Sequence, residues 1–256
     1  MHSITKLAII GNTSLTLKSV NMILQKKEYK ITSIFGLSED QRIHKVNSVD
    51  LKDICDSEKI KLIDDNNWKK FEEICKSDGV KKIICLGDSR IVPSDITTNF
   101  EVLGNHGALL PLVQGGASLV WGRMLNGGHW GISIMNIVSE IDAGTILNTK
   151  TFSYNADTPQ VDFVAKSDNL TVEALEEVLD GKSSAAPNPG WTVRVRKHTD
   201  SRQATKILQY CYENRINVYM PPRTLKDSKI ETNWGADFKE VFKISNDSPY
   251  PMAYDE

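Results

Sequence analysis

Two residues that could do acid–base chemistry stand in glycine-containing segments of this chain. His106 lies in "GNHGALLP", between Gly104 and Gly107, and Asp142 lies thirty-six residues later in "EIDAGTIL". A carboxylate beside an imidazole orients the ring and raises its proton affinity, which suits a histidine that moves protons. Asn105, next to the histidine, has an amide N–H that could donate to a developing oxyanion. These residue types suit a reaction through a tetrahedral intermediate at a carbonyl group, without a metal or a covalent nucleophile.

Each of these residues also has a purely structural interpretation. His106 could be a hydrogen-bonded structural histidine, and Asp142 could cap the turn formed by the residues that follow it. Asn105 stands beside a glycine, where asparagine is a common turn residue. Many His and Asp pairs occur in a chain of 256 residues, so spacing alone does not establish a catalytic pair.

The segments around these residues alternate between strands and helices. Short apolar runs predict buried strands, and apolar residues at helical spacing predict helices between them. The alternation predicts an α/β fold with a Rossmann-like, mostly parallel sheet and helices on both faces. The predicted strands span residues 6–12, 29–36, 60–63, 80–87, 99–106, 130–138 and 191–198, and the predicted helices span 14–27, 66–76, 118–126, 171–179 and 201–215.

This arrangement gives the two polar residues a common position. Ligands of open α/β sheets bind beyond the carboxyl ends of the strands. His106 ends the strand at 99–106, and Asp142 follows the strand at 130–138. We therefore expect the imidazole and the carboxylate to meet at one edge of the sheet.

Composition excludes several classes of function. The net charge of −2 gives no reason to expect a nucleic acid or an anionic membrane as partner. No apolar run approaches the length of about 20 residues that spans a bilayer, and the first residues lack the layout of a signal peptide. The four cysteines are far apart and the five histidines are scattered, so we expect no metal site and a reducing, cytoplasmic setting.

The segment "HGALLPLVQGGASLVWGRMLNGGHWGISIMNIVSEIDAGTIL" resembles the core of the folate-dependent formyltransferases. That family includes methionyl-tRNA formyltransferase, glycinamide ribonucleotide transformylase and the sugar N-formyltransferases, and the layout here is closest to the last group. The elements that carry the resemblance are His106, the Leu-Leu-Pro at 109–111, Gly115, Trp121, the Gly-Ile-Ser-Ile at 131–134 and the Asp-Ala-Gly at 142–144. The segment "KKIICLGDSRIVPSDI" resembles the strand and loop that line the folate pocket in the family.

The resemblance implies a specific reaction. It implies an N-formyltransferase that moves a formyl group from the co-substrate N10-formyltetrahydrofolate to a primary amine. His106, Asp142 and Asn105 would be the catalytic residues. The residues expected to bind the co-substrate are Cys85, Leu86, Gly87, Ile91, Ile141 and Asp142.

The chain departs from the family pattern beside the histidine. The family asparagine stands two residues before the histidine, a position that Gly104 occupies here, while Asn105 is directly adjacent to it. In a strand, residues i and i+2 share a face and neighbours point to opposite faces. Asn105 therefore needs a bulge at Gly104 to turn toward the site, or else the oxyanion donor comes from elsewhere or the chemistry is lost. In addition, Gln114 stands where the family has an arginine.

The second part of the chain carries weaker signals. We expect a catalytic α/β domain at 1–155 and a C-terminal region at 156–256 with a linker at 181–190 and no complete C-terminal barrel. The basic run at 194–198 could hold a phosphate or carboxylate, or could be an exposed strand face. Tyr219, Arg223 and Tyr250 lie near the expected substrate end.

The acceptor is the least determined part of the prediction. By elimination we favour a nucleotide-linked amino sugar, because a tRNA acceptor calls for a basic surface. A homodimer is a further expectation. A hydrolase or other one-carbon enzyme on the same fold, and a folate-binding protein without turnover, remain as alternatives.

Overall fold

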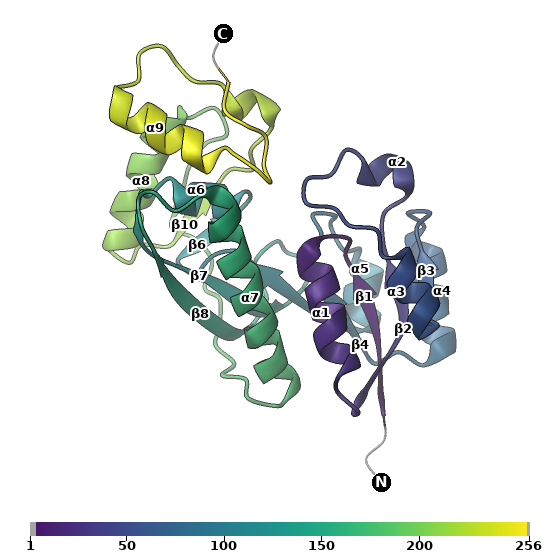
Figure 1. The fold of residues 1–256 in the computed structure, drawn as a ribbon. Coiled ribbons are helices and arrows are strands. Elements are labelled where there is room, and N and C mark those ends of the chain that lie inside the picture. Colours follow the sequence, from purple (N-terminus) through teal and green to yellow (C-terminus); the bar gives the residue numbers. More distant parts are fainter. Residues whose placement is uncertain (1–3, 255–256) are drawn as a thin grey trace.

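A seven-stranded sheet forms the centre of the computed structural model, which describes residues 4–254 (Figure 1). The strand order is β3-β2-β1-β4-β5-β7-β8, and the first five strands are parallel. β7 and β8 are antiparallel to their neighbours. The strands are β1 (Thr5–Ile10), β2 (Tyr29–Phe35), β3 (Lys61–Ile63), β4 (Lys82–Cys85), β5 (Glu101–His106), β7 (Gly128–Asn136) and β8 (Ile146–Tyr154). The mostly parallel sheet predicted from the sequence is confirmed.

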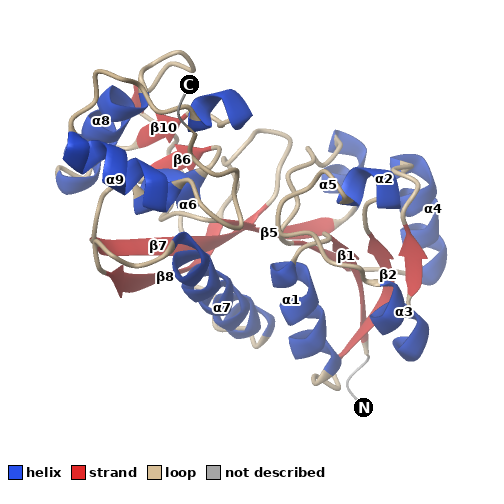
Figure 2. Ribbon diagram, turned by 45° about the horizontal axis from the view of Figure 1, so that its top comes forward, coloured by secondary structure: helices blue, strands red, loops and turns tan. Residues whose placement is uncertain are grey.

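Helices cover both faces of this sheet, as the alternation of elements predicts (Figure 2). One face packs against α1 (Ser14–Leu24), α3 (Lys52–Glu58) and α7 (Gln160–Leu179). The other face packs against α4 (Trp68–Asp78) and α5 (Ser94–Asn99). The central parallel strands β1 and β4 are apolar on both faces because both faces are buried, which is typical of parallel sheets. The short α2 (Glu39–Arg42) lies in the loop between β2 and α3.

A second, smaller sheet lies beyond β7 and carries its own apolar core. Its strands are all parallel, in the order β6 (Val113–Gly115), β10 (Val218–Met220) and β9 (Val193–Arg194). Three helices pack around it: α6 (Ser118–Arg123), α8 (Ser201–Glu213) and α9 (Ala236–Ser245), with a 3₁₀ turn at Leu225–Ser228. This unit joins residues just after His106 to residues of the last third of the chain.

Several predicted elements differ from the structure. The strand predicted at 191–198 is reduced to the two residues of β9, because the Thr199 N–H donates to the Arg196 carbonyl and the chain turns into α8. The helix predicted at 171–179 is only the second half of α7. No predicted strand corresponds to β8, although its burial alternates as expected for a strand with one exposed face.

Helix α7 ties the two parts of the chain together. It follows residue 155, where the sequence predicts a boundary, yet it packs against α1 and against β7 and β8 (Figure 1). The boundary therefore stays a prediction. In the described part of the chain, no helix combines the length and apolar character that a membrane crossing requires.

A buried carboxylate lies between α7 and α1. The Ser14 hydroxyl donates to Asp168 at 3.1 Å, and the Lys18 ammonium is 3.9 Å away. Burial raises the pKa of the Asp168 carboxyl, while Lys18 and the Ser14 hydroxyl lower it. A carboxyl whose pKa is raised by folding stabilises the fold most at low pH, and this contribution is lost as pH rises through the folded-state pKa.

Replacing Asp168 by asparagine is therefore expected to stabilise the protein at neutral pH. Asparagine keeps an acceptor for Ser14 and removes the cost of burying a charge. The gain in free energy of unfolding, measured in urea, should be largest near pH 7 and shrink toward pH 4, near the ordinary pKa of 3.8. The exposed Asp162 of the same helix, replaced by asparagine, is the control. A gain that is equal at every pH would mean that the charge of Asp168 is not the cause.

Candidate active site

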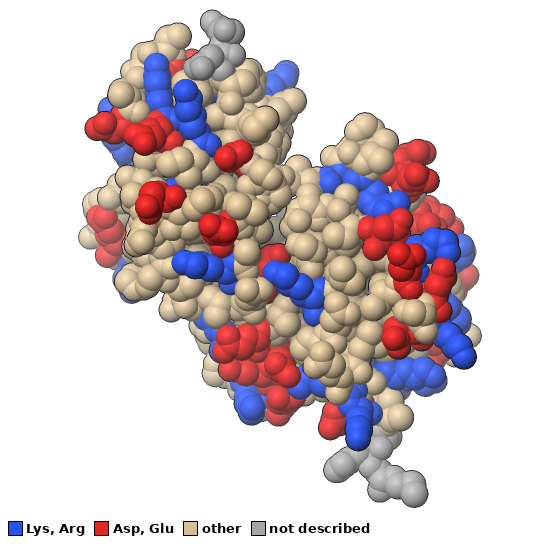
Figure 3. Space-filling model, in the orientation of Figure 1, with Lys and Arg blue, Asp and Glu red and all other residues tan. Residues whose placement is uncertain are grey.

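A cavity of about 890 Å³ opens beyond the carboxyl ends of β4 and β5. Loops from both parts of the chain line it: residues 44–46, 88–92 and 137–142 on one side, and 222–225, 246, 250 and 251 on the other. The surface is indented between the part that carries α9 and the part that carries α2 (Figure 3). The cavity is thus in the position expected for the ligand site of an open α/β sheet.

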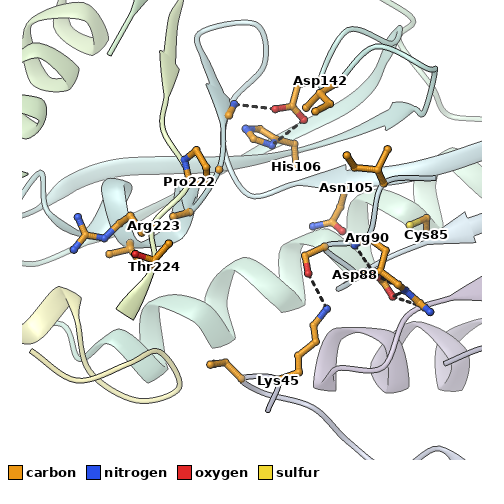
Figure 4. A pocket seen from close by; sticks show the side chains of 18 of the residues that line it. Lys45, Cys85, Asp88, Arg90, Asn105, His106, Asp142, Pro222, Arg223 and Thr224 are labelled. Atoms are coloured by element: carbon orange, nitrogen blue, oxygen red, sulfur yellow. Dashed lines mark hydrogen bonds and ion pairs between the residues drawn. The ribbon is translucent and has the colours of Figure 1, made fainter. Parts of the chain in front are cut away.

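His106 and Asp142 meet at the wall of this cavity (Figure 4). His106 Nδ1 lies 3.5 Å from Asp142 Oδ1, and its Nε2 lies 2.9 Å from the Val113 carbonyl oxygen. The second carboxylate oxygen of Asp142 accepts from the Gly115 N–H at 2.8 Å. Both ring nitrogens of His106 therefore face oxygen acceptors, an environment that can accommodate a proton on either nitrogen. The two residues are brought together as the sequence predicts.

The backbone of Asp142 is held in an unusual conformation. Its φ of 52° is left-handed, a region that aspartate tolerates better than most residues. Asn188 donates its side-chain N–H to the Asp142 carbonyl, and its Oδ1 accepts from Gln114 at 3.1 Å. Asn188 comes from the 181–190 segment, which the sequence identifies only as a linker. Its role in holding the aspartate loop was missed because nothing local connects residues 188 and 142.

The structure excludes the bulge considered for Gly104. β5 pairs with β7 in unbroken register from Leu103 to His106. Asn105 and His106 therefore leave the strand on different sides (Figure 4). Asn105 still lines the same cavity, because β5 ends there, and its Oδ1 accepts from the Gly87 N–H at 3.4 Å.

An isoleucine fills the space that a side chain at position 104 would need. A Cβ on Gly104 would lie 2.4 Å from Cδ1 of Ile137, well inside van der Waals contact. Ile137 also lines the cavity. An apolar side chain thus occupies the space into which the family asparagine would project. The glycine at position 104 and the isoleucine at position 137 are complementary in size.

We expect Gly104→Ala to destabilise the fold by about 1–3 kcal/mol, as overpacking of a core usually does. Ile137→Ala removes the atoms that clash, so the double variant should be more stable than the sum of the single effects predicts. Urea unfolding of the four proteins measures this coupling. Strict additivity would show that Ile137 does not occupy this space.

Four of the six residues expected to bind the co-substrate line the cavity: Cys85, Ile91, Ile141 and Asp142. Ile91 and Ile141 are 71% and 59% exposed, so both offer apolar surface that a ligand in the cavity would bury.

Leu86 and Gly87 are not among the described residues that line the cavity, and their role in binding the co-substrate stays a prediction. The Leu86 N–H donates to the Ile10 carbonyl, and its carbonyl accepts from the Thr16 hydroxyl at 2.7 Å. The Gly87 N–H is used by Asn105. These contacts connect the two residues that follow β4 to β1, α1 and β5.

Sequence reasoning also missed a lysine in the cavity. Lys45 lies in the irregular 43–50 loop and donates to the Ser89 hydroxyl at 3.2 Å (Figure 4). Burial lowers the pKa of Lys45, and the nearby Asp88 raises it. Arg90, by contrast, is fixed by Asp88, by the Phe35 and Gly36 carbonyls and by the Phe35 ring. Lys45 is thus the more available cation at this end.

The opposite end of the cavity contains the three residues that the sequence places near the substrate. Tyr219, Arg223 and Tyr250 all line it. The Arg223 guanidinium lies 4.8 Å from the centre of the Trp121 ring and donates to Asn246 at 3.0 Å. Burial lowers the pKa of Arg223 to about 10. Trp121 itself is 2% exposed and belongs to the apolar core around the small sheet.

Comparisons with known proteins support the resemblance, although no protein-family model matches the chain. Methionyl-tRNA formyltransferase of Parabacteroides distasonis is 25% identical over 176 residues, which cover 65% of this chain and 47% of the relative. The enzyme of the same name from Fusobacterium nucleatum is 24% identical over 266 aligned positions, covering 97% of this chain and 75% of the relative. The chain thus spans about half of the first relative and three quarters of the second.

Solved structures have the same fold. A 4-N formyltransferase from Francisella tularensis has a TM-score of 0.68 at 15% identity, covering 98% of this chain and 92% of that one. Methionyl-tRNA formyltransferase from Clostridium thermocellum has a TM-score of 0.66 at 15% identity, covering 99% and 88%. An N-formyltransferase from Helicobacter canadensis, in complex with folinic acid and dTDP-3-aminofucose, has a TM-score of 0.62 at 14% identity, covering 94% and 80%. The similarity of this chain to folate-dependent formyltransferases, predicted from its sequence, is confirmed.

Proposed function

We propose that this chain is an N-formyltransferase that moves a formyl group from N10-formyltetrahydrofolate to a primary amine. The observation that carries the proposal is the contact of His106 with Asp142 at the wall of a large cavity. The sequence similarity to enzymes named methionyl-tRNA formyltransferase supports the same reaction class. The cytoplasmic location expected from the sequence is part of the proposal, in line with four free, buried cysteines.

The proposed mechanism uses three side chains. The neutral amine nitrogen attacks the formyl carbon, and the carbonyl oxygen becomes an oxyanion that His106 and the Asn105 amide stabilise. Asp142 orients His106 and takes a proton from the amine, directly or through a water. The bond between the formyl carbon and N10 then breaks, and N10 leaves with a proton in place of the one that the amine has lost. The products are a formamide and tetrahydrofolate.

The proposed position of the formyl donor is the side of the cavity formed by residues 85–92 and 137–142. The exposed Ile91 and Ile141 supply apolar contact for a flat ring system. Lys45 supplies positive charge for an anionic donor. The acceptor would then enter from the opposite side, where Tyr219 and Tyr250 line the cavity.

A nucleotide-linked amino sugar remains the acceptor that we favour. Basic and acidic side chains are interspersed on the face drawn in Figure 3, and the net charge is −2. A tRNA partner would favour a continuous basic surface. The Helicobacter canadensis structure, crystallised with a nucleotide-linked amino sugar, supports this choice, whereas the names of the sequence relatives favour tRNA. The homodimer expected from the sequence stays a prediction.

The proposal is tested by incubating the protein with N10-formyltetrahydrofolate and a panel of amines. The panel contains UDP- and dTDP-linked amino sugars, methionyl-tRNA and simple amines, and mass spectrometry identifies the formylated product. Formate released without an acceptor would indicate the hydrolase alternative. Saturable binding of the donor without turnover would indicate a folate-binding protein.

Asn105→Ala is expected to lower kcat/KM by about ten- to a hundredfold, the effect of losing one hydrogen bond to a charged group. The side-chain Oδ1 is used by Gly87, so the N–H₂ group is the part that can face an oxyanion. Asn105→Asp is the matched variant, since it keeps the acceptor and removes the donor. Unchanged kcat/KM in both variants would remove Asn105 from the mechanism.

A further inference from the structure

The small sheet aligns three polar side chains in one row. Tyr219 of β10 is paired with Gln114 of β6 on one side and with Arg194 of β9 on the other. Paired residues on neighbouring strands project from the same face of a sheet. Gln114 is buried, Tyr219 is half-buried and lines the cavity, and Arg194 is exposed. The row therefore leads from the wall of the active-site cavity to the surface.

The row begins at the catalytic pair. Gln114 lies between Val113, whose carbonyl contacts His106, and Gly115, whose N–H contacts Asp142. A group bound along the row would thus have one end close to the proposed chemistry. The arginine that the family resemblance predicts at position 114 is absent, and a guanidinium is found two strands away at Arg194.

A tryptophan covers the outer end of the row. The Trp191 ring lies 6.0 Å from the Tyr219 ring at an interplanar angle of 55°. The guanidinium carbon of Arg194 lies 5.6 Å from the Trp191 centroid and 5.3 Å from the Tyr219 centroid. Trp191 is 44% exposed, so part of its side chain is accessible to a ligand.

The N–H groups of the Arg194 guanidinium are available to a ligand. Within residues 4–254, the Arg194 guanidinium contacts the two rings and has no carboxylate or hydrogen-bond partner. The loop that presents Trp191 is fixed, since Asn217 donates to the Gly190 carbonyl at 2.8 Å and Asn188 contacts Asp142. A preorganised, exposed ring beside an unpaired guanidinium suits a ligand that is flat and anionic.

We propose that Trp191, Tyr219 and Arg194 bind the nucleotide end of the amine acceptor. The base stacks on the exposed Trp191 ring, and the guanidinium of Arg194 pairs with a phosphate. The assignment rests on the proposed function, because it takes the cavity beside Tyr219 as the place where the amine reacts. A base with a phosphate occurs in a nucleoside diphosphate and at the end of a tRNA, and the experiment separates these two sources.

The test measures binding of UDP, dTDP and deacylated tRNA to the full chain by calorimetry, without a formyl donor. Trp191→Ala and Arg194→Gln are each expected to weaken binding at least about tenfold, as loss of a base stack or a charged hydrogen bond does. Trp191→Phe keeps a stacking ring and should lose less. Arg202→Gln, the same charge change at an exposed position of α8, is the matched control and should bind as the wild type does.

Each outcome has a distinct meaning. Binding of UDP or dTDP that depends on Trp191 and Arg194 assigns the site to a small nucleotide-linked acceptor. If only the binding of tRNA depends on these two residues, the site is assigned to the end of a tRNA. Absence of binding by all three ligands, or binding unchanged in both variants, overturns the inference. If the protein formylates simple amines but binds no nucleotide, the nucleotide site is wrong and the proposed function stands. If it binds nucleotides but transfers no formyl group, the proposed function is wrong and the nucleotide site stands.

Discussion

His106→Ala is expected to lower formyl transfer by at least about a hundredfold, because in the proposed mechanism the His106 ring stabilises the oxyanion. The imidazole lies at the cavity wall with Nδ1 3.5 Å from Asp142. The loss should appear in kcat, because the charge on the oxygen develops only in the transition state. Steady-state kinetics with the acceptor identified by the amine panel measure it.

The control for this variant is His129→Ala. His129 is exposed and is not among the described residues that line the cavity. Its replacement should leave kcat unchanged, and thermal unfolding should show that both variants are folded. A His106→Ala protein that retains near-wild-type kcat would exclude His106 from the chemistry.

Asp142→Asn is expected to cause a loss of the same order, at least about a hundredfold. Asparagine keeps an oxygen for the Gly115 N–H and tolerates the left-handed φ of 52°. It cannot take a proton from the amine or supply a negative charge to His106. Asp142→Ala should be equally inactive and also less stable, because alanine is strained at this φ and both carboxylate contacts are lost.

Comparison of the two Asp142 variants separates chemistry from architecture. Equal kcat with unequal melting temperatures is the predicted pattern. Activity of Asp142→Asn near the wild-type level would show that the carboxylate only holds the loop. The double variant of His106 and Asp142 should be about as slow as the slower single variant, since residues that act as a unit are not additive.

The fold and the central pair could be predicted from local sequence. Short apolar runs that alternate with segments of helical periodicity predict the parallel strands. The rule that ligands bind beyond the carboxyl ends of such strands predicts that His106 and Asp142 lie at one edge of the sheet. Both signals can be read from short segments of the sequence. The resemblance to formyltransferases adds that the family has its histidine and aspartate at a similar separation along the chain. The contact at 3.5 Å follows from these signals.

The remaining features depend on contacts between distant residues. Ile137 fills the space beside Gly104, and Asn188 holds Asp142 from a segment with the composition of a linker. Lys45 reaches the cavity from an irregular loop without periodicity. The row of Gln114, Tyr219 and Arg194 requires two parallel strand pairings, one between residues 105 positions apart and one between residues 25 positions apart, which no local pattern predicts.

Asn105 stands one position away from the asparagine of the family pattern, and this shift changes the geometry of the cavity. The unbroken register of β5 and β7 leaves Asn105 on the side opposite the His106 ring, and Ile137 takes the other position. The oxyanion would therefore be approached by the amide from the Gly87 side of the cavity and by the imidazole from the Asp142 side. Both side chains line the same cavity, as the proposed mechanism requires.

The most direct test follows the formyl carbon itself. The wild-type protein is mixed with N10-formyltetrahydrofolate carrying a ¹³C label in the formyl group and with the amine acceptor, and the label is traced by NMR. We predict that the label appears in a formamide while tetrahydrofolate is formed. With the His106→Ala protein, we predict no labelled formamide. Label that stays on the folate, or that leaves only as formate while every amine is unchanged, would contradict a formyl transfer by this cavity.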